Sequence, residues 1–333
     1  MTRPAIALAA ASLLLTLAGC GGSSEPFGLQ ESPNTGQIPG TGLAITASNA
    51  ASAAGLSYAA GVGSLSTIGV ASSVGDLVGG GAPAKPGLGS LERGRLPALV
   101  VLAPFGPVVQ GCAVSGTVSV SGDLASPTAL TSGDSVTLVF DNCNDGTGET
   151  VDGRIDTTID QFTPDVVTPA NFVLGISVVL LDLQLRTAAE TTTGNGDAGV
   201  IVDTSNPTAI RSSVAGNALT IDSGSKSETL SNYSSDESIT LSSESFDFTL
   251  GFRGTLTSTA LNAPVVFSTP LAFEGLVGER PSSGEMLITG NNSSVRLVVL
   301  DRLNVRLDVD SNGDGEIDVA IQTSWDAVLN PPG

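Results

Sequence analysis

Histidine is absent from this sequence of 333 residues, and cysteine occurs only three times. Without histidine there is no Ser-His-Asp or Cys-His catalytic arrangement and no histidine-bound zinc or copper site. Lysine is nearly absent too, because Lys85 and Lys226 are the only two, and neither follows a glycine-rich phosphate loop that opens a helix. The sequence therefore lacks the signatures of the commonest hydrolases and nucleotide-binding enzymes.

Positive charge and aromatic side chains are also scarce. The chain has 13 Lys and Arg against 33 Asp and Glu, and aromatic residues make up 4% of it. Such an acidic surface repels nucleic acid, and it favours solubility and cation binding. Paired carboxylates remain available for glycoside hydrolysis, but the aromatic platforms of sugar sites are rare here. Ser223-Gly-Ser-Lys226 has the spacing of a serine acylase, yet it lies in a Ser/Gly-rich turn, which favours a chance match.

The N-terminus has the layout of an export signal. Arg3 precedes an apolar run from Ala5 to Leu17, which is too short to span a bilayer permanently. The run ends in Leu17-Ala18-Gly19-Cys20, and at this point the chain resembles bacterial lipoprotein precursors. The resemblance implies that the Cys20 sulfur takes a diacylglycerol and that the bond before Cys20 is cleaved. Residue 21 is glycine and not aspartate, and in the resembling family this implies sorting to the outer membrane.

The lipid would hold the protein on a bilayer, facing either the periplasm or the cell surface. Several acyl chains on one residue make a stable anchor, since each buried methylene contributes about 0.8 kcal/mol. Cleavage removes Arg3, so the mature chain has 12 Lys and Arg against 33 Asp and Glu, a net charge of −21. The alternative is an ordinary signal that ends in a cysteine by chance.

Cys112 and Cys143 remain once Cys20 is assigned to the lipid. An even remainder in an exported chain favours a disulfide between them. Closing the loop between them stabilises the fold by roughly 3–4 kcal/mol in the chain-entropy model. Two unpaired buried thiols are the alternative.

Composition divides the chain into five parts. Residues 1–19 are the signal peptide, 20–42 a flexible tether rich in Gly, Ser and Pro, and 43–78 an Ala/Gly/Ser-rich helical segment. Residues 79–94 form a Gly/Pro-rich linker, and 95–333 an antiparallel β domain. Residues 32–75 carry no charge, but their many polar groups would need partners in hydrocarbon, so we do not expect this stretch to cross a membrane.

Beyond the linker, apolar residues alternate with Ser, Thr and Asp, which indicates strands with one buried and one wet face. The runs include Val118 and Val120, Val136 to Phe140, Val151 to Ile159, Phe172 to Leu180, and Phe246 to Phe252. Asn195-Gly196-Asp197 and Gly290-Asn291-Asn292-Ser293 are interpreted as turns. The predicted fold is mainly β: a large antiparallel sheet, or an open barrel or sandwich, with a short Ala/Gly-rich N-terminal helical segment. An outer-membrane barrel also alternates, but it would carry aromatic girdles.

The numbering of the cysteines tests the disulfide. Within a hairpin, even-numbered valines are expected to pair with even-numbered partners, because residues on one face lie directly across from one another. Cys112 belongs to the even set and Cys143 to the odd set. A bridge between them therefore predicts a β-bulge or a strand end near Asp141 and Asn142.

One segment near the C-terminus has a metal-binding pattern. The run from Asp310 to Asp318, D-S-N-G-D-G-E-I-D, resembles the calcium loop of EF-hand and dockerin-like proteins. The resemblance implies a Ca²⁺ cofactor, with Gly315 permitting an unusual backbone conformation and Ile317 pinning the loop to the core. The implied ligands are side-chain oxygens of Asp310, Asn312 and Asp314, the Glu316 carbonyl, and an Asp318 oxygen, direct or through water.

Two features depart from that family. Position twelve is Ile321 where a bidentate glutamate is expected, and the flanking segments alternate like strands. We therefore expect a loop on a β-hairpin and a structural role for the ion, with weak affinity unless Asp308 or a distant carboxylate completes the shell. A plain Asn-Gly/Asp-Gly hairpin turn is the alternative. The stretch 141–146 lacks the ligand spacing and is interpreted as an acidic turn beside the disulfide.

Three functions remain open at this level. The first is a non-enzymatic envelope lipoprotein with a structural or ligand-binding role, whose sheet holds an apolar ligand or contacts an envelope protein. The body is similar to Thr/Gly-rich proteobacterial lipoproteins that end in a D-x-N-G-D-G strand turn and a tryptophan, here Trp325. The second is a secreted carbohydrate-active enzyme with a structural calcium, and the third an adhesin or assembly subunit. Trp325 is expected to close a core, although with Phe140 or Phe252 it could line a pocket.

Overall fold

The computed structural model describes residues 41–64, 105–125, 131–144, 146, 148–164, 171–242 and 245–330. Five predicted features lie outside these residues: the signal peptide, Cys20, the tether up to residue 40, the 65–78 part of the helical segment, and the 79–94 linker.

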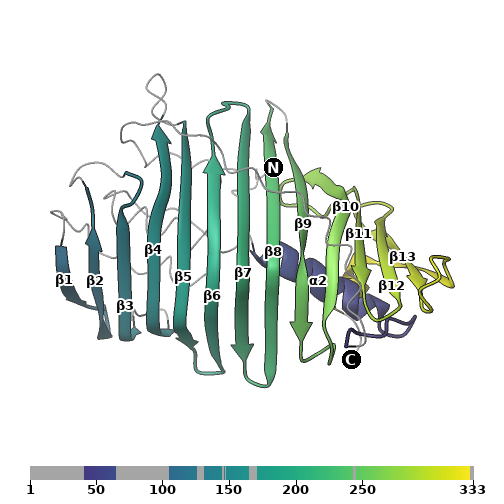
Figure 1. Ribbon diagram of the computed structural model, residues 1–333, viewed down its shortest axis with the longest axis horizontal. Coiled ribbons are helices and arrows are strands. Elements are labelled where there is room, and N and C mark those ends of the chain that lie inside the picture. The colour runs from purple at the N-terminus through teal and green to yellow at the C-terminus, as the bar shows by residue number, and fades with distance from the viewer. Residues whose placement is uncertain are drawn as a thin grey trace, which may run out of the picture. The chain divides into compact units, whose positions relative to one another are not determined.

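The described residues form a fourteen-stranded antiparallel sheet in which the strands follow one another in sequence order (Figure 1). This confirms the predicted mainly β fold and its large antiparallel sheet. The strands are β1 (Phe105–Gly111), β2 (Ser115–Asp123), β3 (Ser135–Asn144), β4 (Thr150–Pro164), β5 (Phe172–Arg186), β6 (Thr191–Asp203), β7 (Ala209–Ser223), β8 (Lys226–Leu241), β9 (Phe246–Ser258), β10 (Val265–Leu276), β11 (Ser283–Thr289), β12 (Ser294–Val299), β13 (Asn304–Asp310) and β14 (Val319–Ser324).

The strands divide between two compact units, which are described separately. The first contains β1 to β7, and the second contains β8 to β14 with the helices α2 (Ala50–Ser64) and α4 (Trp325–Leu329). In both units most strands have one apolar, buried side, as the alternation predicts; the outermost strands β1 and β14 are more exposed. In β11, for example, Met286 and Ile288 are fully buried, whereas their neighbours in the strand are only half-buried. Burying a side chain of this size contributes about 1.5–3 kcal/mol.

Pairing in the first unit follows the predicted register. Val118 lies opposite Phe140 and Val120 opposite Leu138, so even-numbered residues of β2 meet even-numbered residues of β3. All four side chains are buried. The alternation of the sequence therefore sets which face of this hairpin is apolar.

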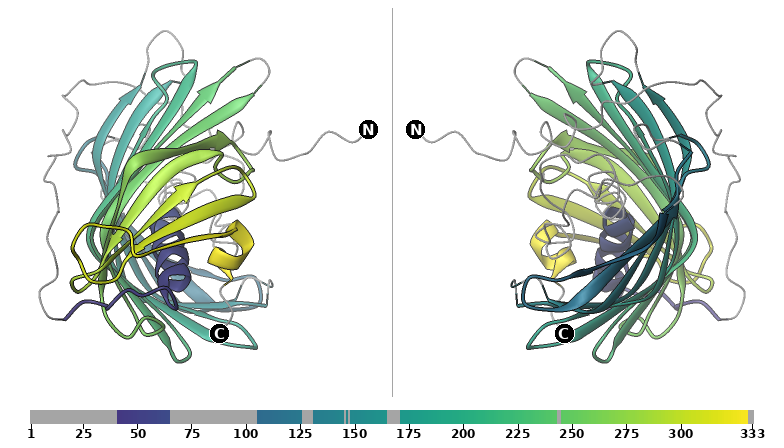
Figure 2. Two further views of the ribbon diagram at one scale, coloured as in Figure 1. Left: turned by 90° about the vertical axis from the view of Figure 1, so that its right-hand side faces the viewer. Right: turned by 90° about the vertical axis from the view of Figure 1, so that its left-hand side faces the viewer.

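In the second unit, helix α2 lies against one face of the sheet (Figure 2). The helix is made almost entirely of small residues, and its glycines allow a close approach. A Cβ on Gly55 would lie 2.0 Å from the carbonyl oxygen of Val328 in α4, and one on Gly61 would lie 2.4 Å from the ring of Phe252. These two glycines weaken the isolated helix, but the packing requires them.

Polar contacts fix both ends of α2. Before the helix, the Asn49 side chain accepts a hydrogen bond of 2.8 Å from the Thr46 N–H. At its C-terminal end, buried Ser64 and Ser235 share a hydrogen bond of 2.6 Å, and Ser235 also donates to the carbonyl oxygen of Gly61 at 2.9 Å. The helix is thus held at one position on strand β8.

An aromatic cluster fills the space between α2, the sheet and α4. The ring of Tyr58 lies 4.9 Å from that of Trp325 and 5.2 Å from that of Phe273, and Phe252 and Phe267 extend the cluster. Trp325 is completely buried, so the prediction that it closes a core is confirmed. Burial raises the pKa of the Tyr58 hydroxyl to about 12, partly offset by the nearby positive charge of Arg280.

The two predicted turns have different outcomes. Residues 290–293 do connect β11 to β12, and Asn292 adopts the left-handed conformation typical of turns, with φ of 44°. The turn at Asn195-Gly196-Asp197 was a wrong prediction, because these residues lie in the middle of β6. Their role there is described below.

Candidate functional site

The loop that resembles a calcium site connects β13 to β14, so the predicted mounting on a β-hairpin is confirmed. Its backbone is wound around the carboxylate of Asp310. That carboxylate accepts hydrogen bonds from the N–H groups of Gly313 at 2.7 Å and Gly315 at 3.0 Å. Both glycines adopt positive φ, 76° and 87°, which other residues resist.

The side chains of Asn312, Asp314 and Asp318 also bond within the loop. Asn312 accepts from the Asp314 N–H, and Asp314 accepts from the Glu316 N–H, each at 2.8 Å. Asp318 accepts from the N–H and the hydroxyl of Ser311, and these bonds lower the pKa of its carboxyl group. These bonds give the loop a defined shape.

One expectation about this loop is not met. Ile317 does not pin it to the core, because its side chain is 59% exposed beside the edge strand β14. Asp308, one candidate to complete a calcium shell, is buried and forms a two-fold ion pair with Arg306, at 2.7 and 2.8 Å. Among the described residues, no three acidic or cysteine side chains are grouped so as to hold a metal ion. The loop has the oxygen chemistry that calcium requires, but its carboxylates bond to its own N–H groups.

A disulfide joins Cys112 to Cys143 in the first unit, with their Cα atoms 5.5 Å apart. The β-bulge that this bridge predicts is present. On β3, Phe140 pairs with Gly153 but Cys143 pairs with Val151, so β3 has one residue more than β4 over this stretch. Asn142, inside the bulge, has φ of 48°. β3 also has one residue more than β2 here, because Ser115 pairs with Asn144 but Thr117 with Asp141, and this brings odd-numbered Cys143 into reach of Cys112.

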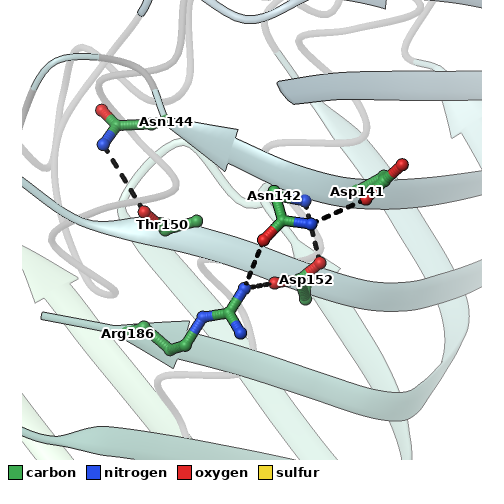
Figure 3. A network of polar contacts seen from close by, with 6 residues as sticks. All are labelled: Asp141, Asn142, Asn144, Thr150, Asp152 and Arg186. Carbon is green, nitrogen blue, oxygen red and sulfur yellow. Dashed lines mark hydrogen bonds and ion pairs between the residues drawn. The ribbon is translucent and has the colours of Figure 1, made fainter. Parts of the chain in front are cut away.

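Polar side chains surround this bulge (Figure 3). Asp152 on β4 accepts the Asn142 N–H at 2.8 Å and forms an ion pair with Arg186 on β5. Arg186 also donates to the Asn142 side chain at 2.8 Å, and that side chain donates to Asp141 at 2.9 Å. The network ties three strands together. As most of it is exposed, its ion pair adds at most about 1 kcal/mol.

The same arrangement, in which a bulge donates an N–H to an Asp or Asn side chain on the neighbouring strand, recurs across the first unit. Asp182 on β5 is a second bulge residue with φ of 48°, and its N–H is accepted by Asn195 on β6 at 2.7 Å. On β7, the N–H groups of Asn217 and Ala218 are accepted by Asp197 at 3.0 and 3.2 Å. Each acceptor directly flanks a glycine of positive φ, Gly153 or Gly196, that leaves room for the neighbouring bulge. Such bulges bend strands and increase their twist.

In the second unit, part of the apolar sheet face continues beyond the end of α2. Ser235, which bonds to α2, shares its face of β8 with Glu237, Ile239 and Leu241, and these lie opposite Leu250, Phe248 and Phe246 of β9. Ile239, Leu241, Phe246 and Phe248, which we call the open apolar patch, are partly exposed, Phe246 by 40%. Burial raises the pKa of the Glu237 carboxyl group beside them.

In comparisons with known proteins, no family model, curated protein or solved structure matches the chain. In the part of the chain that the structure describes, no helix has both the length and the apolar character needed to span a membrane.

Proposed function

We propose that this chain is a cell-envelope lipoprotein, anchored in the outer membrane through acylated Cys20, whose β domain has a structural or ligand-binding role and no enzymatic one. The observation that carries the proposal is the Cys112–Cys143 bridge. Disulfides of this kind persist in oxidising compartments outside the cytoplasm. The bridge leaves Cys20 as the single unpaired cysteine, at the end of the apolar N-terminal run.

Metabolic labelling with a palmitate analogue in a bacterial host tests the anchor. We expect the full chain to carry the label and to fractionate with membranes, and Cys20→Ser to lose both properties. Cys112→Ser is the matched control, because it removes a cysteine of the bridge and leaves the label in place. An unlabelled wild-type protein contradicts the proposal.

The open apolar patch supports the ligand-binding form of the role. Its side chains extend the aromatic core of the second unit, on the same sheet face as α2. We propose that it holds the apolar part of a lipid-like molecule, because partly exposed aliphatic and aromatic side chains are the surface that such a molecule covers.

Native mass spectrometry and lipid extraction of the purified protein test this role. We expect a bound apolar molecule that is lost in Phe248→Ser and kept in Leu303→Ser, which changes an exposed leucine elsewhere in the second unit. A protein that carries no such molecule, or two variants that retain it equally, contradicts ligand binding at this patch and leaves the structural role.

A further inference from the structure

The antiparallel order places alternate connections at the same end of the second unit. The β9–β10 turn at 259–264, the β11–β12 turn at 290–293 and the β13–β14 loop at 311–318 share one end, which we call the tether end. The turns at 277–282 and 300–303 lie at the opposite end.

The chain enters the second unit at the tether end. The Leu43 N–H donates to the carbonyl oxygen of Pro264 at 3.0 Å, and the Leu43 carbonyl accepts from the Asn291 N–H at 2.8 Å. Ile45 is fully buried, and its N–H donates to the Ser293 hydroxyl at 2.8 Å. The described chain therefore starts, at Thr41, beside the tether end of the sheet.

The acidic loop lies next to this entry point. A Cβ on Gly313 would lie 2.8 Å from the carbonyl oxygen of Asn292, in the turn that holds Leu43. Just after the loop, Ile317 is 59% and Val319 41% exposed. Large apolar side chains thus face solvent beside the point from which the chain leads back to Cys20.

We propose that the tether end of the second unit rests on the bilayer that carries acylated Cys20, with Ile317 and Val319 in contact with lipid. The inference relies on the proposed acylation. A chain of this Gly/Ser-rich composition and about 21 residues has an r.m.s. end-to-end length of about 25 Å. This keeps the tether end close to the membrane, so a weak apolar contact forms as an intramolecular step.

The charge of the tether end determines which lipid it contacts. Asp310, Asp314, Glu316 and Asp318 lie in the loop, and the turns at 259–264 and 290–293 carry no Lys or Arg. Carboxylates are repelled by anionic headgroups within a Debye length of about 8–10 Å. The contact is therefore with zwitterionic lipid and weakens as anionic lipid replaces it.

Hydrogen exchange of the acylated full-length protein, purified from membranes and placed on phosphatidylethanolamine/phosphatidylcholine vesicles, tests the contact. The reference is the Cys20→Ser protein free in solution. We expect several-fold slower exchange at 290–293 and 311–319 on the vesicles, and unchanged exchange at 277–282 and 300–303. The slowing decreases when phosphatidylglycerol replaces part of the lipid. Ile317→Ser removes it, whereas Leu303→Ser, a more exposed leucine at the opposite end, leaves it intact.

Flotation of the same vesicles separates the two proposals. A protein that does not float contradicts the lipid anchor and this inference with it. A protein that floats with unchanged exchange at the tether end, or with slowed exchange at 300–303 instead, contradicts this inference alone. Slowing that increases with phosphatidylglycerol also overturns it.

Discussion

At the scale of single residues, the sheet of the first unit depends on glycines whose side-chain space is taken by a neighbouring strand. Gly153 has φ of 107°, and a Cβ there would lie 2.3 Å from the carbonyl oxygen of Asp182. Gly133 has a similar φ of 92° with nothing within 4 Å of its Cβ position. Alanine substitutions at these two glycines therefore separate the energetic cost of backbone strain from that of a steric clash.

Gly133→Ala is expected to lower the free energy of unfolding by about 1–2 kcal/mol, the cost of a left-handed conformation. Gly153→Ala is expected to lose roughly 1–3 kcal/mol more, because the neighbouring bulge must shift. Urea denaturation of the two variants measures the difference. Equal losses would show that the close approach of β4 to the β5 bulge has no energetic importance.

The pH dependence of stability follows from Glu237. Burial raises its pKa in the folded state above that of the unfolded chain, so the folded protein holds the proton more tightly. Its contribution is therefore fully favourable below the unfolded pKa and is lost as pH rises through the folded pKa. We expect Glu237→Gln to be more stable than wild type at pH 7, with the difference gone below the ordinary glutamate pKa, as thermal melts across pH would show. If Glu237→Gln and wild type were equally stable at pH 7 as well as at low pH, the burial of this carboxyl group would be contradicted.

At the scale of elements, local sequence patterns predicted about half of the strands but not the residues that modify them. Alternation predicts the faces of β2 and β3, and the parity of Cys112 and Cys143 predicts the bulge between them, because both depend only on counting along the chain. Asn195-Gly196-Asp197 was misread as a turn because Asn, Gly and Asp form turns locally. In β6 they support bulges on the neighbouring strands β5 and β7, 13 and 20 residues away, beyond the reach of a local turn pattern. Ile317 was misplaced for a related reason: the pattern does not reveal that β14 is an edge strand.

The disulfide closes a separation of 31 residues, from just after β1 to near the end of β3. Replacing both members, Cys112→Ser with Cys143→Ser, is expected to lower the free energy of unfolding by roughly 3–4 kcal/mol, since the unfolded chain regains its loop entropy. Chemical denaturation under non-reducing conditions measures it. Cys20→Ser is the control and should leave the value unchanged. Equal stability of the double variant and wild type would show that the bridge is dispensable.

Calcium binding by the β13–β14 loop stays a prediction. If the ion binds only the folded protein, calcium at a hundredfold excess over its dissociation constant adds about 2.7 kcal/mol. Differential scanning calorimetry with millimolar calcium should then show a rise in melting temperature that Asp310→Ala with Asp314→Ala abolishes. Asp301→Ala, which removes a capping carboxylate from a different turn, should retain the rise. A melting temperature independent of calcium would support the plain hairpin turn.

At the scale of the whole molecule, the account rests on export. Acylation of Cys20 and oxidation of Cys112 and Cys143 both require that the chain leave the cytoplasm. The acidic composition, with 33 Asp and Glu, is consistent with the proposal that lipid and not charge holds the domain near a membrane. The proposed lipid anchor, the disulfide bridge and the proposed membrane contact of the tether end would then all follow from export out of the cytoplasm.

Intact mass spectrometry of the protein purified from membranes tests this claim most directly. The account predicts a chain that begins at Cys20, carries acyl groups on that residue, and has lost two hydrogen atoms to the Cys112–Cys143 bridge. A chain that still begins at Met1, with three free thiols and no acyl mass, would contradict it.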